Sequence, residues 1–119
     1  MRPRAQPPPY GINFDKHKPL AYNHTMFKWD GAKSEANLAA RGFDFAHACL
    51  VFDGPTLELD DDRSDYGERR TQVIGRVGAD ILFVVFTWRG SVRRIISARL
   101  ANRKERDIHE KTFSGAGAP

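Results

Sequence analysis

Residues 80–99 read DILFVVFTWRGSVRRIISAR, and this stretch decides the fold because two strand-like segments meet there at a glycine turn. Residues 81–88 are almost wholly apolar and rich in β-branched and aromatic side chains, which is typical of a central strand covered on both faces. Arg89, Gly90 and Ser91 supply the turn. The sequence therefore predicts a β-hairpin at the centre of a sheet.

The returning strand carries arginines whose directions follow from the two-residue period of a strand. Ideal alternation puts Arg93, Ser97 and Arg99 on one face and Arg94 on the other. Only a bulge, the twist or the strand end would bring Arg94 and Arg99 together. Guanidinium groups present a planar fork of donors that matches phosphate oxygens, so the hairpin indicates an anion-binding surface. The alternative for each arginine is that it merely solvates an exposed face.

The length of 119 residues predicts one domain. Residues 1–25 hold five of the seven prolines and show no helix or strand period. We therefore expect a disordered or extended tail over 1–25, a domain over 26–113 and a flexible tail over 114–119. The lone Cys49 lies in an apolar stretch and is interpreted as a core thiol of a cytoplasmic protein, and no apolar run is long enough to cross a membrane.

Charge is distributed unevenly along the chain, although its net value is only +4. Residues 26–68 hold 4 Lys/Arg and 10 Asp/Glu, whereas residues 69–111 hold 11 Lys/Arg and 4 Asp/Glu. The second half therefore predicts a basic face for nucleic acid or an acidic partner, unless the two halves only attract each other. The acidic run of Asp60, Asp61, Asp62 and Asp65 lacks the pattern of a calcium loop, so we expect a solvated loop and no metal.

The remaining elements follow from capping and turn signals. Asp30 and Gly42 predict the start and stop of a first helix, and a short second helix is expected over 44–51. Strands are expected over 56–59 and 68–77, and Asn102 with Glu105 predicts a capping box for a closing helix over 103–112. The predicted fold class is α+β, with two N-terminal helices, a mostly antiparallel four-stranded sheet and a C-terminal helix.

Several segments together resemble the BrnT family, the toxin half of a bacterial type II toxin–antitoxin pair. The resemblance runs from about residue 27 to about residue 110 and is carried by FKWDGAKSEANLAARGF, ACLVFDGP, YGERRTQVIGR, FTWRG and VRRIISARLANRKER. It implies a RelE-like fold and a ribonuclease that arrests translation by cleaving RNA. It also implies a BrnA-type antitoxin with a ribbon-helix-helix domain, so that operator DNA is contacted only through the antitoxin. No cofactor and no membrane are expected.

The resemblance also implies site residues. The matching positions are Glu68 and Arg70 on one strand, Thr87 and Arg89 at the end of the next, Arg94, Ser97 and Arg99 on the last, and Glu105 and Arg106 on the closing helix. The sequence departs from the family at His109, where tyrosine is usual. A histidine there either exchanges a proton near neutral pH or merely packs.

Metal-independent RNA cleavage needs a base for the 2′-hydroxyl, cations for the phosphorane and an acid for the leaving oxygen. Only Glu68 and His109 are suited to proton exchange, while arginines suit phosphate binding. The predicted catalytic set is Glu68, Arg70, Arg89, Arg99 and His109. The predicted RNA-binding set is Thr87, Trp88, Arg93, Arg94, Ser97, Arg103 and Arg106.

Alternatives remain open for this interpretation. Glu68 and Arg70 share a strand face, so they equally suit a simple ion pair, and Trp88 is a hydrophobic anchor before it is a base-stacking residue. A basic RNA-binding or antitoxin-binding module without catalysis fits the same sequence.

Overall fold

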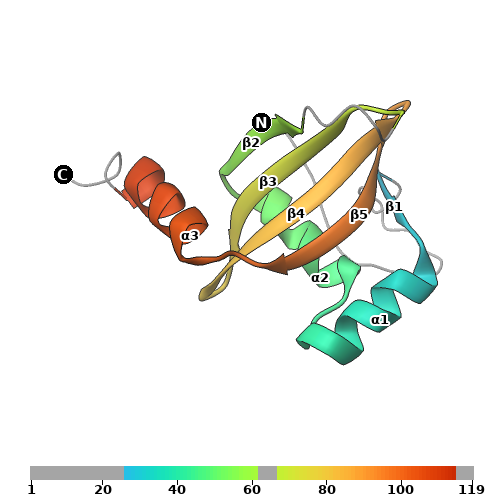
Figure 1. Cartoon of the computed structure of the whole chain (residues 1–119), viewed down its shortest axis with the longest axis horizontal. Coiled ribbons are helices and arrows are strands. Elements are labelled where there is room, and N and C mark those ends of the chain that lie inside the picture. Colours follow the sequence, from blue (N-terminus) through green and yellow to red (C-terminus); the bar gives the residue numbers. More distant parts are fainter. Residues whose placement is uncertain (1–25, 62–66, 115–119) are drawn as a thin grey trace.

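The hairpin predicted over residues 80–99 forms the centre of the sheet in the computed structural model, which describes residues 26–61 and 67–114 (Figure 1). Strands β4 (Asp80–Arg89) and β5 (Val92–Leu100) are antiparallel, and Gly90 in their turn has a φ of 63°, a left-handed conformation that favours glycine. The other strands are β1 (Phe27–Trp29), β2 (Thr56–Asp61) and β3 (Arg70–Val77). Their order in the sheet is β1-β5-β4-β3-β2.

The four-stranded antiparallel sheet expected from the sequence is wrong in one respect, because the sheet has five strands and is mixed. β1 pairs in parallel with β5, with Phe27 opposite Arg93 and Trp29 opposite Ile95. The three residues of β1 are too few to show a two-residue period, and their partners lie far away in the sequence. Neither local propensity nor turn chemistry could therefore reveal this strand.

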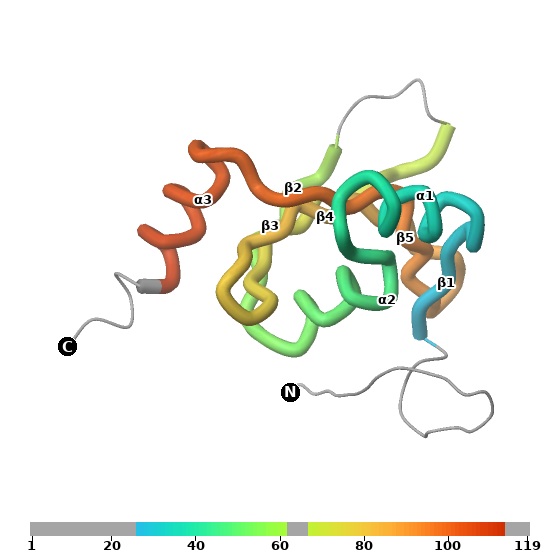
Figure 2. The backbone as a smooth tube through the Cα atoms, turned by 90° about the horizontal axis from the view of Figure 1, so that it is seen from below, coloured from blue at the N-terminus to red at the C-terminus, as the bar shows by residue number. Residues whose placement is uncertain are grey.

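Helices cover one face of the sheet. α1 (Gly31–Arg41) begins where the Asp30 carboxylate accepts a hydrogen bond from the Lys33 amide at 3.0 Å, and ends at Gly42, whose φ is 89°. The expected second helix is α2 (Phe45–Ala48), which continues as a 3-10 helix, η2 (Cys49–Asp53). Figure 1 shows α2 behind the strands, and Figure 2 shows the same arrangement from below.

The main core lies between this helical layer and the sheet. Its largest fully buried side chains are Phe86, Leu82, Ile95, Val51, Val73 and Val84. Cys49 packs against this cluster, and burial raises the pKa of its thiol well above the usual value, which fits a core thiol. The helices are joined by a buried hydrogen bond of 2.9 Å that the Phe45 amide donates to the Ser34 hydroxyl. The helical layer is therefore fixed by packing and by polar contacts.

No helix of residues 26–61 and 67–114 covers the centre of the opposite face of the sheet (Figure 1). In β5 the regular alternation breaks, because Phe86 pairs with Ile95 and Val85 pairs with Ser97, which leaves Ile96 as an extra residue. Ile95 and Ala98 consequently both face the core, although they are three positions apart. The bulge also moves Ser97 and Arg99 to the side of Arg94, so the prediction from ideal alternation that placed them with Arg93 is wrong. We call this side the open face.

The closing helix lies at one end of the sheet (Figure 1). α3 (Arg103–His109) begins with the predicted capping box between Asn102 and Glu105 and continues as a π-helical turn, η4 (Glu110–Ser114). A second apolar cluster of Ile74, Ile81 and Ala101 lies at this end. Within the described ranges, none of the helices has both the length and the apolarity needed to span a membrane.

Some expectations fall outside the described residues, namely the N-terminal tail over 1–25, Asp62 and Asp65 of the acidic run, and residues 115–119. Asp60 and Asp61 end β2 instead of lying in a loop. Across residues 26–61 and 67–114, no three His, Cys, Asp or Glu side chains gather as metal ligands would.

Gly75 allows η2 to approach β3 closely. A Cβ added there would lie 2.8 Å from Cβ of Val51, which belongs to the buried core, whereas a Cβ added at Gly54 would meet nothing within 4 Å. We expect Gly75→Ala to lower the free energy of unfolding by about 1–3 kcal/mol, because the helical layer must shift. Gly54→Ala should change it by less than about 0.5 kcal/mol. Urea denaturation measures both, and equal effects would show that η2 does not pack as described.

Candidate functional site

Basic side chains gather on the open face at the end of the sheet away from α3. Arg94 pairs with Thr87 of β4 on one side and with Lys28 of β1 on the other. Arg70 lies on the same face of β3, because its neighbour Thr71 pairs with the core residue Phe86. Neighbouring strands lie about 5 Å apart, so the three basic side chains form one row across the sheet. We call Lys28, Arg94 and Arg70 the basic row.

Glu68 lies next to this row, just before β3. Its Oε1 is 3.2 Å from Nη2 of Arg89, at the end of β4, and its Oε2 is 3.6 Å from Nη2 of Arg70. The Glu68 side chain is 29% exposed and that of Arg89 is 53% exposed, so both remain accessible to a ligand. The structure thus brings together one carboxylate and two guanidinium groups from the predicted catalytic set.

Thr87 holds the segment before β3 against β4. Its hydroxyl donates a 2.8 Å hydrogen bond to the carbonyl oxygen of Arg69, and the residue is 2% exposed. A buried hydroxyl with its donor already used is a poor ligand for RNA. We therefore interpret Thr87 as a residue that positions Glu68 and Arg70, and not as one that contacts RNA itself.

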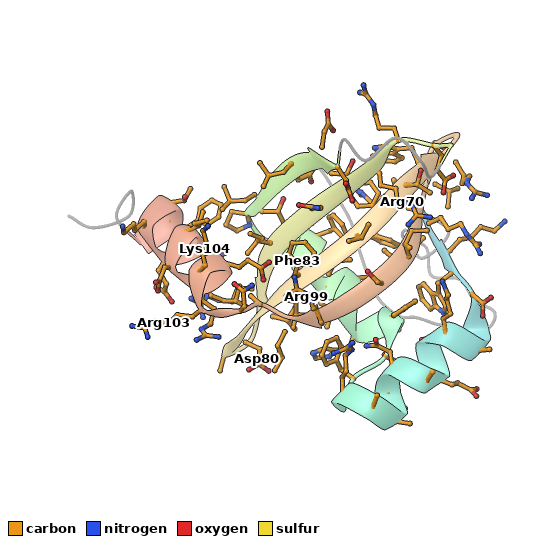
Figure 3. The ribbon with its side chains drawn as sticks, viewed as in Figure 1. Arg70, Asp80, Phe83, Arg99, Arg103 and Lys104 are labelled. Atoms are coloured by element: carbon orange, nitrogen blue, oxygen red, sulfur yellow. The ribbon has the colours of Figure 1, made fainter. Side chains whose placement is uncertain are left out.

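Arg99 lies on the same face but nearer to α3 (Figure 3). Its Nη1 and Nη2 atoms donate to Oε1 and Oε2 of Glu105, each at 2.9 Å. Its Cζ atom lies 4.1 Å from the ring centroid of Phe83. Hydrogen bonding from Arg99 is the largest cause of the lowered pKa of Glu105. The pair is therefore a charged, bidentate contact between β5 and α3.

Trp88 and Arg93 lie on the helical side of the sheet, so the structure does not bring them together with the basic row. They pair with each other across the hairpin. The Cζ atom of Arg93 lies 4.3 Å from the ring centroid of Phe52, 4.7 Å from Trp88, 5.4 Å from Phe86 and 6.0 Å from Phe27. Burial lowers the pKa of Arg93. This guanidinium closes an aromatic cluster beside the core.

His109 lies in α3, at the opposite end of the sheet from Glu68. The residue is 3% exposed, and neither of its ring nitrogens has a hydrogen-bond partner among the described residues. Its ring lies 4.7 Å from that of Phe113. Burial, with a smaller contribution from Arg76, lowers its pKa. The position suits packing, and it does not suit proton exchange beside Glu68.

The remaining predicted residues occupy different places. Ser97 is exposed on the open face between Arg94 and Arg99. Arg103 is exposed at the start of α3, while Arg106 donates a 3.0 Å hydrogen bond to the carbonyl oxygen of Ala101. Lys28 was missed because the strand that carries it was missed. The only signal was its place between two aromatic residues, Phe27 and Trp29.

A family model described as the ribonuclease toxin BrnT of type II toxin–antitoxin systems matches residues 29–105. The chain belongs to the BrnT family. Members of the BrnT family are ribonuclease toxins, which implies an RNA target and an antitoxin partner. Among curated proteins, no match to the chain was found.

The match to the BrnT model separates the predicted site residues. It includes Glu68, the Arg99–Glu105 pair and, from the basic row, Arg70 and Arg94. Lys28 lies before the matched stretch, and Arg106 and His109 lie after it. The residue that departs from the family resemblance thus lies outside the matched stretch.

The buried His109 should make folding sensitive to mild acid. The pKa of His109 is lower in the folded protein than the value of about 6.5 expected in the unfolded chain. Its contribution to the free energy of unfolding is therefore intact above about pH 6.5 and is lost as the pH falls towards the pKa of the folded state. We expect the free energy of unfolding of His109→Phe to exceed that of the parent by about 1 kcal/mol at pH 5.5, because the unfolded parent takes up a proton that the buried ring resists and the variant has no such group. The difference should shrink at pH 8. Urea denaturation at both pH values measures it, and a difference independent of pH would contradict a buried neutral histidine.

Proposed function

We propose that the chain is an mRNA-cleaving toxin whose Glu68 acts as the general base and whose neighbouring arginines bind the scissile phosphate. The observation that carries this proposal is the position of Glu68 between Nη2 of Arg89, at 3.2 Å, and Nη2 of Arg70, at 3.6 Å. A base must lie beside the groups that hold the phosphate, because the 2′-hydroxyl and the phosphorus are adjacent in RNA. The open face supplies both in one place.

In the proposed reaction the scissile phosphate displaces one arginine from Glu68. The carboxylate of Glu68 then takes the proton of the 2′-hydroxyl while the 2′-oxygen forms a bond to phosphorus. Arg70 and Arg89 neutralise the charge that accumulates on the phosphorane oxygens. The bond from phosphorus to the 5′-oxygen breaks, and that oxygen takes a proton from water. The products are a 2′,3′-cyclic phosphate and a 5′-hydroxyl.

Water is the proposed proton donor because the two side chains that contact Glu68 are both arginines, Arg70 and Arg89. A guanidinium does not readily release its proton. His109 lies at the far end of the sheet and is 3% exposed, so it is not assigned a catalytic role. The proposed reaction thus requires one titrating side chain, and its positive charge comes from the protein without a metal ion.

The antitoxin is proposed to be of the BrnA type, with a ribbon-helix-helix domain that contacts operator DNA. Family membership supports an antitoxin partner in general. An antitoxin that covered the basic row or Glu68 would prevent RNA from reaching them. Inhibition would then follow from steric exclusion.

RNA binding without cleavage is a second candidate. It is favoured by the ion pairs of Glu68 themselves, because both carboxylate oxygens already face an arginine, as in a structural cluster. A structural Glu68 would leave the basic row as an RNA-binding surface only.

Three variants separate these functions. Glu68→Gln keeps the shape of the side chain but cannot accept a proton, so we expect cleavage of a purified RNA to fall by about 10²–10⁴-fold. Arg89→Ala should also reduce cleavage, and His109→Phe should cleave as the parent does. Single-turnover assays measure the rates, and thermal unfolding shows that the variants are folded.

The chemistry of the products provides the control. RNA with a single 2′-deoxy nucleotide at the cleavage position should remain uncut, and the products of ordinary RNA should end in a cyclic phosphate. Binding by the folded parent without any cut would favour the second candidate. Cleavage by Glu68→Gln at the parental rate would reject Glu68 as the base.

A further inference from the structure

The guanidinium of Arg99 is held from one edge and leaves another edge available. Glu105 accepts hydrogen bonds from both terminal nitrogens, and the carbonyl oxygen of Leu100 accepts a further one of 3.1 Å from Nη1. An arginine has five N–H groups. The two that remain, on Nε and Nη2, are parallel neighbours, and neither donates a hydrogen bond to any of residues 26–61 and 67–114.

The orientation of this edge is fixed by several contacts. Phe83 lies beneath the guanidinium at 4.1 Å. The Glu105 oxygen that accepts from Nη1 also accepts a 2.8 Å hydrogen bond from the Asn102 amide, which ties the carboxylate to the start of α3. The side chains of Arg99 and Glu105 are 37% and 16% exposed. Arg99 thus remains accessible on the open face, while the carboxylate that holds it is mostly covered.

The free Nε–Nη2 edge of Arg99 suits a phosphate, although Glu105 already pairs with this guanidinium. Two parallel N–H groups match two oxygens of a phosphate. Arg103 and Lys104 directly precede Glu105 in α3, and Figure 3 shows them at the same end of the sheet as Arg99. Their charges outweigh that of nearby Asp80, so the surroundings stay positive although Glu105 neutralises Arg99.

The Arg99 edge lies too far from Glu68 to share its phosphate. Arg99 pairs with Phe83, whereas Arg94 of the basic row pairs with Thr87. Phe83 and Thr87 are four residues apart in β4, which corresponds to about 13 Å along a strand. A free arginine could lean across part of this distance, but Arg99 is held by Glu105 and Phe83.

We propose that the Nε–Nη2 edge of Arg99 binds an RNA phosphate that is not the scissile one, and that Glu105 is the positioning residue that aims this edge. The inference rests on the proposed function, because it takes Glu68 as the place of cleavage. The substrate is then a single strand that crosses the open face along β4 and β5. Binding at Arg99 holds the strand in register and does not take part in the chemical step.

A phosphate scan tests the proposal. In a single-stranded oligonucleotide, each phosphate in turn is replaced by a neutral methylphosphonate, and KM and kcat are measured for the parent, Arg99→Ala, Arg99→Lys and Glu105→Gln. One non-scissile replacement should raise KM for the parent by about tenfold, the effect expected for a charge-assisted hydrogen bond. The same replacement should have no effect in Arg99→Ala. Arg99→Lys should not restore the parent, because lysine lacks the fork.

Lys104→Ala is the matched control, since it removes one charge beside Glu105 without touching the fork. It should change KM by less than about threefold and should keep the sensitivity to the replaced phosphate. Glu105→Gln should raise KM with kcat unchanged. We call Arg99 coupled to a phosphate when replacing that phosphate affects the parent but not Arg99→Ala. If Arg99 were coupled to the scissile phosphate alone, or to no phosphate, the proposal would be overturned.

The phosphate scan remains decisive if the protein does not cleave RNA. The oligonucleotides then carry the same replacements and a 2′-deoxy nucleotide at every position, so that they cannot be cleaved. Fluorescence anisotropy measures their affinity, which gives the coupling without any cleavage. Absence of cleavage with coupling intact would reject the proposed function and keep the phosphate site. Loss of antitoxin affinity in Arg99→Ala, with no coupling to any phosphate, would assign the edge to a protein carboxylate and overturn the proposal.

Discussion

The extra residue Ile96 in β5 determines which side chains the open face presents. A strand without a bulge would turn Arg99 towards the helical layer, where Ile95 and Ala98 fill the core. The pairing of Val85 with Ser97 instead of Ile96 shifts the second half of the strand by one position. The cost is a local break in the hydrogen-bond ladder. The result is that Arg94, Ser97 and Arg99 share one accessible face with the carboxylate of Glu68.

The sequence predicted elements that have local signals. Asp30 and Gly42 delimit α1, Asn102 and Glu105 cap α3, and the glycine turn defines the hairpin, because each of these residues acts on the backbone close to it in the sequence. It did not predict β1 or the bulge. β1 is stabilised by a parallel partner more than sixty residues away, and the bulge depends on which of two neighbouring isoleucines the core accepts. The candidate site was therefore predicted as a set of residue types. Strand alternation separated Arg93 from Arg94, but the position of Ser97 and Arg99 on the side of Arg94 depended on the bulge.

Two arginine–carboxylate clusters on the open face differ in their geometry and so in their proposed roles. At Glu68 the contacts are single, 3.2 and 3.6 Å long, and Arg89 is 53% exposed, so water and an anion compete for each guanidinium at little cost. At Glu105 the contact is bidentate, with two distances of 2.9 Å, and the carboxylate also caps α3. The first cluster can open to admit a phosphate. The second cluster favours phosphate binding when the Arg99–Glu105 pair stays intact, because an Arg99 guanidinium that is already fixed loses less rotational freedom when it binds.

The surroundings of Arg93 on the helical side of the sheet explain why it has no role in the proposed RNA chemistry. Arg93 is held among Phe52, Trp88, Phe86 and Phe27, and burial there lowers its pKa. A phosphate approaching this guanidinium would have to displace aromatic side chains that also line the core, and it would meet Glu58, whose charge already acts on Arg93. In the part of the chain that the structure describes, Arg94 on the open face meets neither obstacle, and its neighbours across the strands are Thr87 and Lys28. The two adjacent arginines thus have different surroundings because their side chains lie on opposite sides of the sheet.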